Sequence, residues 1–229
     1  MSALAYLVNG PLLAWLSPFV LGAVCILAIL IHFGALPRIE DRFGGRRHTY
    51  RFLVRSTIAF RVLYAAFLTV AQYVVWSAGG LSRMFLDSPL VLPEHMEVLP
   101  RWIAWIFHTQ GGYFFFYAWG RFWFNAALSI GVAFLWYLFL RFLARHKDRF
   151  FDEGEVMLGF LSALLVGWPR ITLFVPLLFL CVVGVALVRR IVWGREYTTL
   201  GTPFTVSALI VILLGGPLLA MTGLSVLSV

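Results

Sequence analysis

Residues 152–190 read DEGEVMLGFLSALLVGWPRITLFVPLLFLCVVGVALVRR, and they decide the fold class. Between Val156 and Val188 the one charged side chain is Arg170. The part that follows it, 171–188, is uncharged and long enough to cross a bilayer, because a transmembrane helix needs roughly 17–25 apolar residues. Arg189 and Arg190 then end the apolar stretch. The pattern predicts an all-α integral membrane protein.

The composition of the whole chain supports the same class. It is 62% hydrophobic and 12% charged, with a mean hydropathy of +0.91, whereas soluble domains are about 45–50% apolar and about 25% charged. Little sequence is left for a soluble domain, so we expect a single transmembrane domain over 1–229. The net charge of +8 is typical of basic loops that fix topology rather than of a surface that binds nucleic acid.

Further apolar segments lie on both sides of this stretch. They predict a polytopic bundle of about six to eight transmembrane helices in the inner (cytoplasmic) cell membrane, with the lipid bilayer as its partner. The first segment has no basic stretch before it and is long enough to span, so we expect it to be retained rather than cleaved as a signal peptide. The expected segments are 12–35, 62–82, 102–120, 122–140, 156–168, 171–188 and 203–224.

Three basic clusters, 38–55, 141–149 and 189–195, predict the cytoplasmic side of the membrane. Three expected spans separate the first two clusters, and an odd number would put them on opposite sides. One segment must therefore cross twice, re-enter or lie in the interface. The candidates are 52–86, whose first third carries three arginines, and 102–120, which Gly111-Gly112 interrupts.

Sequence spacing gives no sign of a metal, a cofactor or a disulfide. Cys25 and Cys181 are isolated in apolar segments, so neither belongs to a Cys-x-x-Cys pair. The five histidines have no ligand spacing, and we expect each to be an interfacial or core residue: His32, His48, His95, His108 and His146.

Three of the ten acidic residues fall in one window, 152–155, at the start of an apolar segment. Carboxylates at the start of a membrane helix are costly to desolvate, so their presence there calls for a structural or chemical explanation. One reason is structural, because acids offset the dipole in the first turn of a helix. The other is chemical, because a carboxylate at the interface can activate water against a peptide bond.

The segment around Glu155 resembles the type IV prepilin peptidases, in which a Gly-Asp-x-Lys-Leu motif opens a helix that ends in Gly-Trp. Here 154–158 reads GEVML, and Gly167-Trp168 follows at the family's interval without a gap. Upstream, 130–137 resembles the helix that the family places before its motif, and downstream LGTPF at 200–204 resembles the entry to its last helix. Weaker similarities extend to the N-terminal segments 19–22, 36–38 and 50–54. Asp87, followed by Leu92-Pro93-Glu94, is similar to the family's first catalytic aspartate.

The resemblance implies an intramembrane aspartyl endopeptidase that removes leader peptides from membrane-inserted, prepilin-like substrates. Its catalytic residues would be Asp87 and Glu155, sharing one water as base and acid, with no cofactor and no metal. The chain departs from the family in its second acid, a glutamate, and in Met157, which replaces the motif lysine. Asp87 is also one residue too close to Pro93, and the cysteine-containing domain linked to N-methylation is absent, so we expect no methyl transfer.

Two alternatives to a peptidase remain open. One is a catalytically inactive peptidase fold that serves as a membrane scaffold or subunit, which the glutamate and Met157 favour. The other is a lipid-using transferase similar to the prolipoprotein diacylglyceryl transferases, suggested by 99–113 with Gly111-Gly112 and His108, and by Gly120-Arg121 with Asn125. The structural explanation of that second region is a glycine-broken aromatic helix that packs closely on a neighbour.

Overall fold

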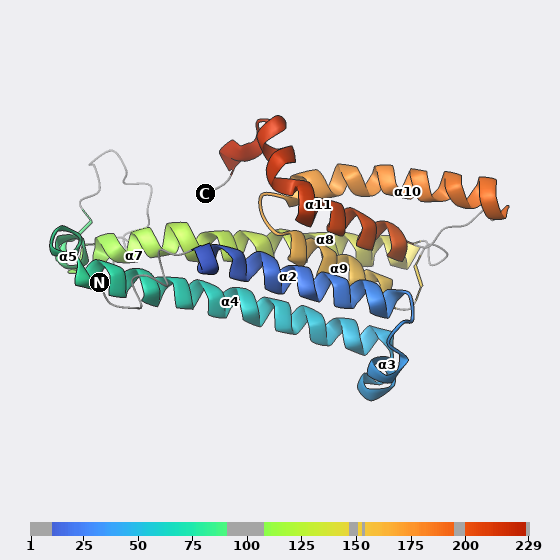
Figure 1. Cartoon of the computed structure of the whole chain (residues 1–229), viewed down its shortest axis with the longest axis horizontal. Helices are drawn as coiled ribbons and strands as arrows, with labels where there is room; N and C mark the ends of the chain where they lie inside the picture. The colour runs from blue at the N-terminus through green and yellow to red at the C-terminus, as the bar shows by residue number, and fades with distance from the viewer. Residues whose placement is uncertain (1–10, 91–107, 147–150, 153, 195–199, 228–229) are drawn as a thin grey trace. The chain divides into compact units, whose positions relative to one another are not determined.

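The computed structural model describes residues 11–90, 108–146, 151–152, 154–194 and 200–227 (Figure 1). Helices form nearly all of this part, and it contains no strand. The helices are α2 (Pro11–His32), α3 (Pro37–Phe43), α4 (Arg46–Ala78), α5 (Gly80–Asp87), α7 (Gly112–Ala118), the π-helical turn η2 (Trp119–Trp123), α8 (Phe124–His146), α9 (Glu155–Val166), α10 (Ile171–Trp193), α11 (Gly201–Met221) and the 3₁₀ turn η4 (Leu224–Leu227).

In the part of the chain that the structure describes, five helical stretches are long and apolar enough to cross a membrane: Trp15–His32, Arg46–Ala78, Gly112–His146, Ile171–Val192 and Gly201–Met221. A sixth apolar helix, α9, has 12 residues and a length of only about 18 Å at 1.5 Å per residue. The prediction of an all-α, multi-pass membrane bundle is therefore confirmed.

The helix boundaries remove the conflict in the expected topology. The segments expected at 102–120 and 122–140 are not separate spans, because one continuous helical stretch runs from Gly112 to His146. Gly111, with φ at +83°, precedes the first residue of α7 and so does not break a helix. Residues 102–107 lie outside the described part. Among the described residues, two candidate spans, α4 and the stretch 112–146, separate the first two basic clusters, and an even number of crossings would return the chain to the same side.

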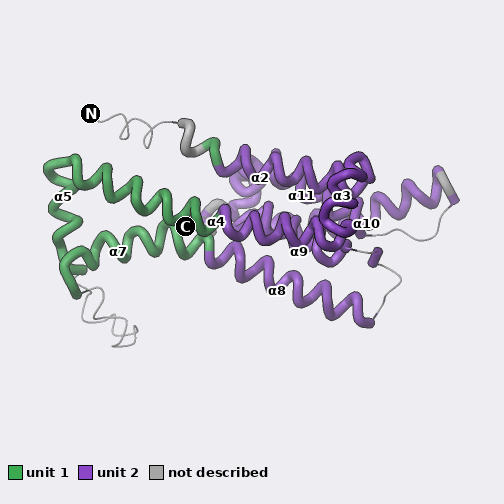
Figure 2. The backbone as a smooth tube through the Cα atoms, turned by 90° about the horizontal axis from the view of Figure 1, so that it is seen from below, with its two compact units in different colours: residues 1–16, 61–126, 229 green, residues 17–60, 127–228 purple. Residues whose placement is uncertain are grey.

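The chain divides into two compact units (Figure 2). Unit 1 comprises 1–16, 61–126 and 229, and unit 2 comprises 17–60 and 127–228. Unit 1 holds an aromatic cluster around Trp76, whose ring lies 4.9 Å from that of Tyr117 and 5.5 Å from that of Phe114. Within the same unit the indole N–H of Trp123 donates to the Thr69 hydroxyl at 3.1 Å.

The core of unit 2 is built around α9. Its residues from Leu158 to Val166 are all buried, because this helix is apolar on every side and has neighbours on every side. Helices α9, α10 and α11 pack against one another. Gly159 permits a close approach of neighbouring helices, since a Cβ there would meet the side chain of Leu140 in α8 and lie 2.9 Å from Cζ of Phe204 in α11.

Several helices begin or finish toward the same end of unit 2. The C-terminal ends of α2, α8 and α10 lie there with the N-terminal ends of α4, α9 and α11 (right-hand side of Figure 1). Helix α9 leaves this end, the chain turns at 167–170, and α10 returns to it, so the pair starts and finishes on one side. The described members of the three basic clusters therefore gather at one end, as the charge pattern predicts; 147–149 and 195 lie outside the described part.

Candidate functional site

Glu155 lies at the N-terminus of α9, and its side chain is only 3% exposed. Its Oε1 accepts the backbone N–H of Gly201 at 2.8 Å, and its Oε2 accepts those of Leu200 at 3.2 Å and Asp152 at 3.0 Å. Helix N-termini leave N–H groups without intrahelical acceptors and carry positive partial charge. One carboxylate therefore caps the start of α11 and also the turn that opens α9.

Two glycines mark the ends of α9, and they are the glycines of the motif that resembles the prepilin peptidases. Gly154 has φ at +86° and Gly167 has φ at +66°, and residues other than glycine rarely adopt such positive φ angles. Immediately after Gly167 the backbone N–H of Trp168 donates to the Ser129 hydroxyl of α8 at 3.0 Å. The motif spacing thus corresponds to one complete short helix with a fixed turn at each end.

His32 and Thr202 lie beside Gly201, which donates its N–H to the carboxylate. His32 is the last residue of α2, and its Nε2 lies 3.3 Å from the Thr202 hydroxyl oxygen. A Cβ at Gly201 would meet the His32 ring and lie 2.6 Å from Oε1 of Glu155. Only a glycine at position 201 leaves room for both the His32 ring and the Glu155 carboxylate. Helices α2, α9 and α11 therefore pack closely against one another at the basic end of unit 2.

The sequence did not identify His32, Gly201 or Thr202 as site residues. His32 was expected to be an ordinary interfacial or core histidine, and 200–204 was noted only for its similarity to a family motif. The available signal was the coincidence of a histidine at the end of the first span with a glycine at the start of the last. Only the packing brings these two residues to the same carboxylate.

Asp87, the other predicted catalytic residue, is the last residue of α5 and is exposed. It belongs to unit 1, whereas Glu155 belongs to unit 2, so the two do not share a compact unit. The Leu92-Pro93-Glu94 sequence that accompanies Asp87 lies outside the described residues. The Asp87–Glu155 dyad therefore stays a prediction.

The residues that suggested a lipid-using transferase are dispersed around α7 and α8. His108 is exposed and precedes α7. Arg121, in η2, donates to the Tyr117 hydroxyl at 3.0 Å and lies over the ring of the same tyrosine at 5.6 Å. Gly111 approaches α5, where a Cβ would lie 3.3 Å from the Leu86 carbonyl oxygen, which agrees with the structural explanation of close packing.

Metal-binding geometry is not found in the described ranges: no group of three or more His, Cys, Asp or Glu residues is placed to hold an ion there. Cys25 is buried and Cys181 is half-buried, and both are free thiols.

Comparison with protein-family models, with curated proteins and with solved structures finds no match. The similarity to the prepilin peptidases therefore rests on the residues quoted for it alone.

Proposed function

We propose that the chain is a non-enzymatic, multi-pass membrane protein of peptidase-like architecture that serves as a scaffold or subunit in the membrane. The observation that carries this proposal is the environment of Glu155. A general base must present an oxygen to the water whose proton it removes. Here three backbone N–H groups occupy the two carboxylate oxygens, and the side chain is 3% exposed. This arrangement supports a structural carboxylate.

The order of the spans adds a second argument. Helix α4 is a single helix of 33 residues, about 50 Å long, against a hydrocarbon core of roughly 30 Å. If α4 crosses the bilayer once, Asp87 follows it on the face opposite the first basic cluster. Glu155 follows the second basic cluster, on the face of the first. One water could not then be shared by the two carboxylates.

The second candidate is the peptidase itself, with Asp87 and Glu155 as its catalytic pair and a prepilin-like leader peptide as its substrate. One observation favours it. The two segments that carry the strongest family similarity, 154–158 and 200–204, are joined directly through the hydrogen bonds from Leu200 and Gly201 to Glu155. A family-like arrangement of these two motifs is compatible with either function.

Cleavage of a synthetic prepilin-like peptide in liposomes separates the two candidates. The scaffold proposal expects no product from the wild-type protein, a lower unfolding temperature for Glu155→Gln and an unchanged one for Asp87→Asn. The peptidase expects product from the wild type and none from either variant, with both variants folded. Wild-type cleavage that disappears in Asp87→Asn would overturn the scaffold proposal.

A further inference from the structure

A cavity of about 360 Å³ opens at the basic end of unit 2 between α4, α8 and the start of α9. Arg47 and Arg51 line it from the first turns of α4, and Tyr137 and Arg141 line it from α8. Residues four apart lie on the same face of a helix, so each of the two helices turns one face toward the cavity. Gly154, Val156 and Met157 complete the lining from α9.

Within the described ranges, no ion pair joins the three arginines of the cavity to a carboxylate. The ion pair observed there joins Arg46 to Glu40 at 3.0 Å, and it involves none of the three. The carboxylate of Glu155 accepts the N–H groups of Leu200 and Gly201 and does not line the cavity. Like charges that converge repel one another, so an anion bound among them would relieve an unfavourable arrangement.

The start of α9 supplies the second feature of an anion site. Val156 and Met157 belong to the first turn of this 12-residue helix, where backbone N–H groups lack intrahelical acceptors and the helix dipole is positive. Helix N-termini combined with arginines bind phosphate groups, because the guanidinium fork matches two phosphate oxygens. The cavity therefore has the chemistry of a phosphate site.

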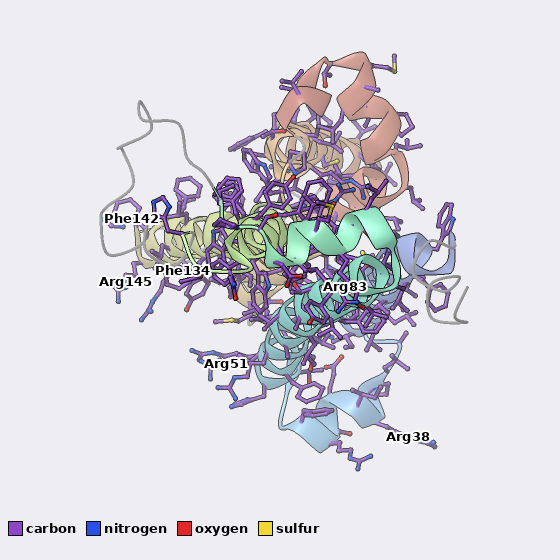
Figure 3. All side chains as sticks on the ribbon, turned by 90° about the vertical axis from the view of Figure 1, so that its left-hand side faces the viewer. Arg38, Arg51, Arg83, Phe134, Phe142 and Arg145 are labelled. Atoms are coloured by element: carbon purple, nitrogen blue, oxygen red, sulfur yellow. The ribbon has the colours of Figure 1, made fainter. Side chains whose placement is uncertain are left out.

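The surroundings of the cavity indicate a phosphate that is attached to a lipid. Figure 3 shows Arg51 extending from α4 on the other side of that helix from Arg38 of α3, and it shows Phe134 and Phe142 on α8. Both phenylalanines are exposed, as is Leu138 between them, and they form an apolar stripe beside Tyr137 and Arg141. A headgroup in the cavity would place its acyl chains along this stripe, whereas free phosphate would make no use of it.

We propose that this cavity binds the phosphate headgroup of an anionic phospholipid from the membrane leaflet at the basic end of the protein. Basic pockets between transmembrane helices on the cytoplasmic side are suited to such headgroups. The inference is independent of whether Glu155 is structural or catalytic, because Glu155 is not among the residues that line the cavity.

The test measures lipid binding to the purified, detergent-solubilised chain by native mass spectrometry and by titration. The probes are phosphatidylglycerol, phosphatidylcholine and inorganic phosphate. The variant is the triple change Arg47→Gln, Arg51→Gln and Arg141→Gln. Its matched control removes the same charge from exposed arginines outside the cavity, by Arg38→Gln, Arg42→Gln and Arg145→Gln.

Phosphatidylglycerol should bind the wild type at least tenfold more tightly than phosphatidylcholine, and the cavity variant should lose about tenfold in affinity while the control loses less than about threefold. Equal losses in the two variants would show diffuse surface attraction and overturn the site. Phosphate that binds as tightly as the lipid would overturn the lipid as its occupant. If the triple variant does not fold, affinity should fall in the order wild type, Arg51→Gln, Arg51→Glu, and an unchanged affinity across that series would overturn the proposal.

Discussion

Glu155 and Gly201 depend on each other although 46 positions separate them in the sequence. The glycine provides both the N–H that the carboxylate accepts and the space that the carboxylate and His32 occupy. A buried carboxylate that lost these donors would be left without the partners that stabilise it. The two residues thus form one structural contact, and changing either residue separately tests how much that contact contributes to stability.

Glu155→Gln should lower the stability of the protein. The amide NH₂ would face backbone N–H donors, and leaving a buried polar group unsatisfied costs about 1–3 kcal/mol, or several degrees in unfolding temperature for a chain of this size. Thermal unfolding in detergent measures it. Asp41→Asn, at an exposed carboxylate of α3, serves as the control and should have no effect; an equal response of the two variants would refute the structural role of Glu155.

Gly201→Ala should also lower the unfolding temperature, because the new methyl group would collide with His32 and Glu155. Gly216→Ala in the same helix is the matched control. No atom lies within 4 Å of a Cβ there, and alanine is the better helix former by up to about 1 kcal/mol. In a His32→Ala background the Gly201→Ala change should cost less. If the cost is the same, the collision is not its cause.

At the scale of the helices, α9 packs closely against its neighbours. A Cβ at Gly159 would meet the side chain of Leu140 in α8 and lie 2.9 Å from Cζ of Phe204 in α11. Gly159→Ala should therefore destabilise the bundle by about 1–3 kcal/mol, the usual cost of overpacking a core. Gly184→Ala in α10, with open space around the new methyl group, should leave the unfolding temperature unchanged or raise it. The reverse ranking would contradict the packing described for α9.

The accuracy with which the sequence predicts the boundaries of each helix depends on which residues stand at those boundaries. The span at 171–188 was found because arginines bound a continuous apolar stretch, and α10 ends only a few residues later. From the sequence alone the stretch 112–146 divides into two expected segments, because Gly111-Gly112 interrupts one of them and Arg121 separates it from the next. In the structure the glycine pair opens the helix, and the arginine remains inside the helical run through a π-helical turn and its bond to Tyr117.

The candidate site was predicted only in part, and the reason is physical. Glu155 was singled out because acids are rare in this chain, and its position at a helix start was foreseen. Its partners Leu200, Gly201 and His32 come from two other helices. A single sequence carries no signal for contacts made by backbone N–H groups, since every residue other than proline offers one. The arginine at 141 is distant in the sequence from those at 47 and 51, and the sequence does not show that the three line one cavity. From the sequence they therefore indicate only topology.

For the molecule as a whole, the decisive quantity is the number of times the chain crosses the bilayer between Arg42 and Asp87. Helix α4 is the one candidate span in that interval, so we expect Asp87 on the face opposite Arg42, and Arg145, beyond the next span, on the same face as Arg42. Single cysteines introduced by Arg42→Cys, Asp87→Cys and Arg145→Cys would report this through an impermeant maleimide. The background would be Cys25→Ala with Cys181→Ala, which should fold normally because both native thiols are free.

Labelling of positions 42 and 145 from one side and of position 87 from the other would support a single crossing and a structural Glu155. Labelling of all three positions from one side would mean that 46–87 returns to the side where it began. Asp87 and Glu155 would then share a membrane face, and a carboxylate pair with a common water would become physically accessible. Labelling of position 87 from the opposite side would therefore exclude the Asp87–Glu155 dyad without any knowledge of the substrate, because roughly 30 Å of hydrocarbon cannot separate two groups that act on one water.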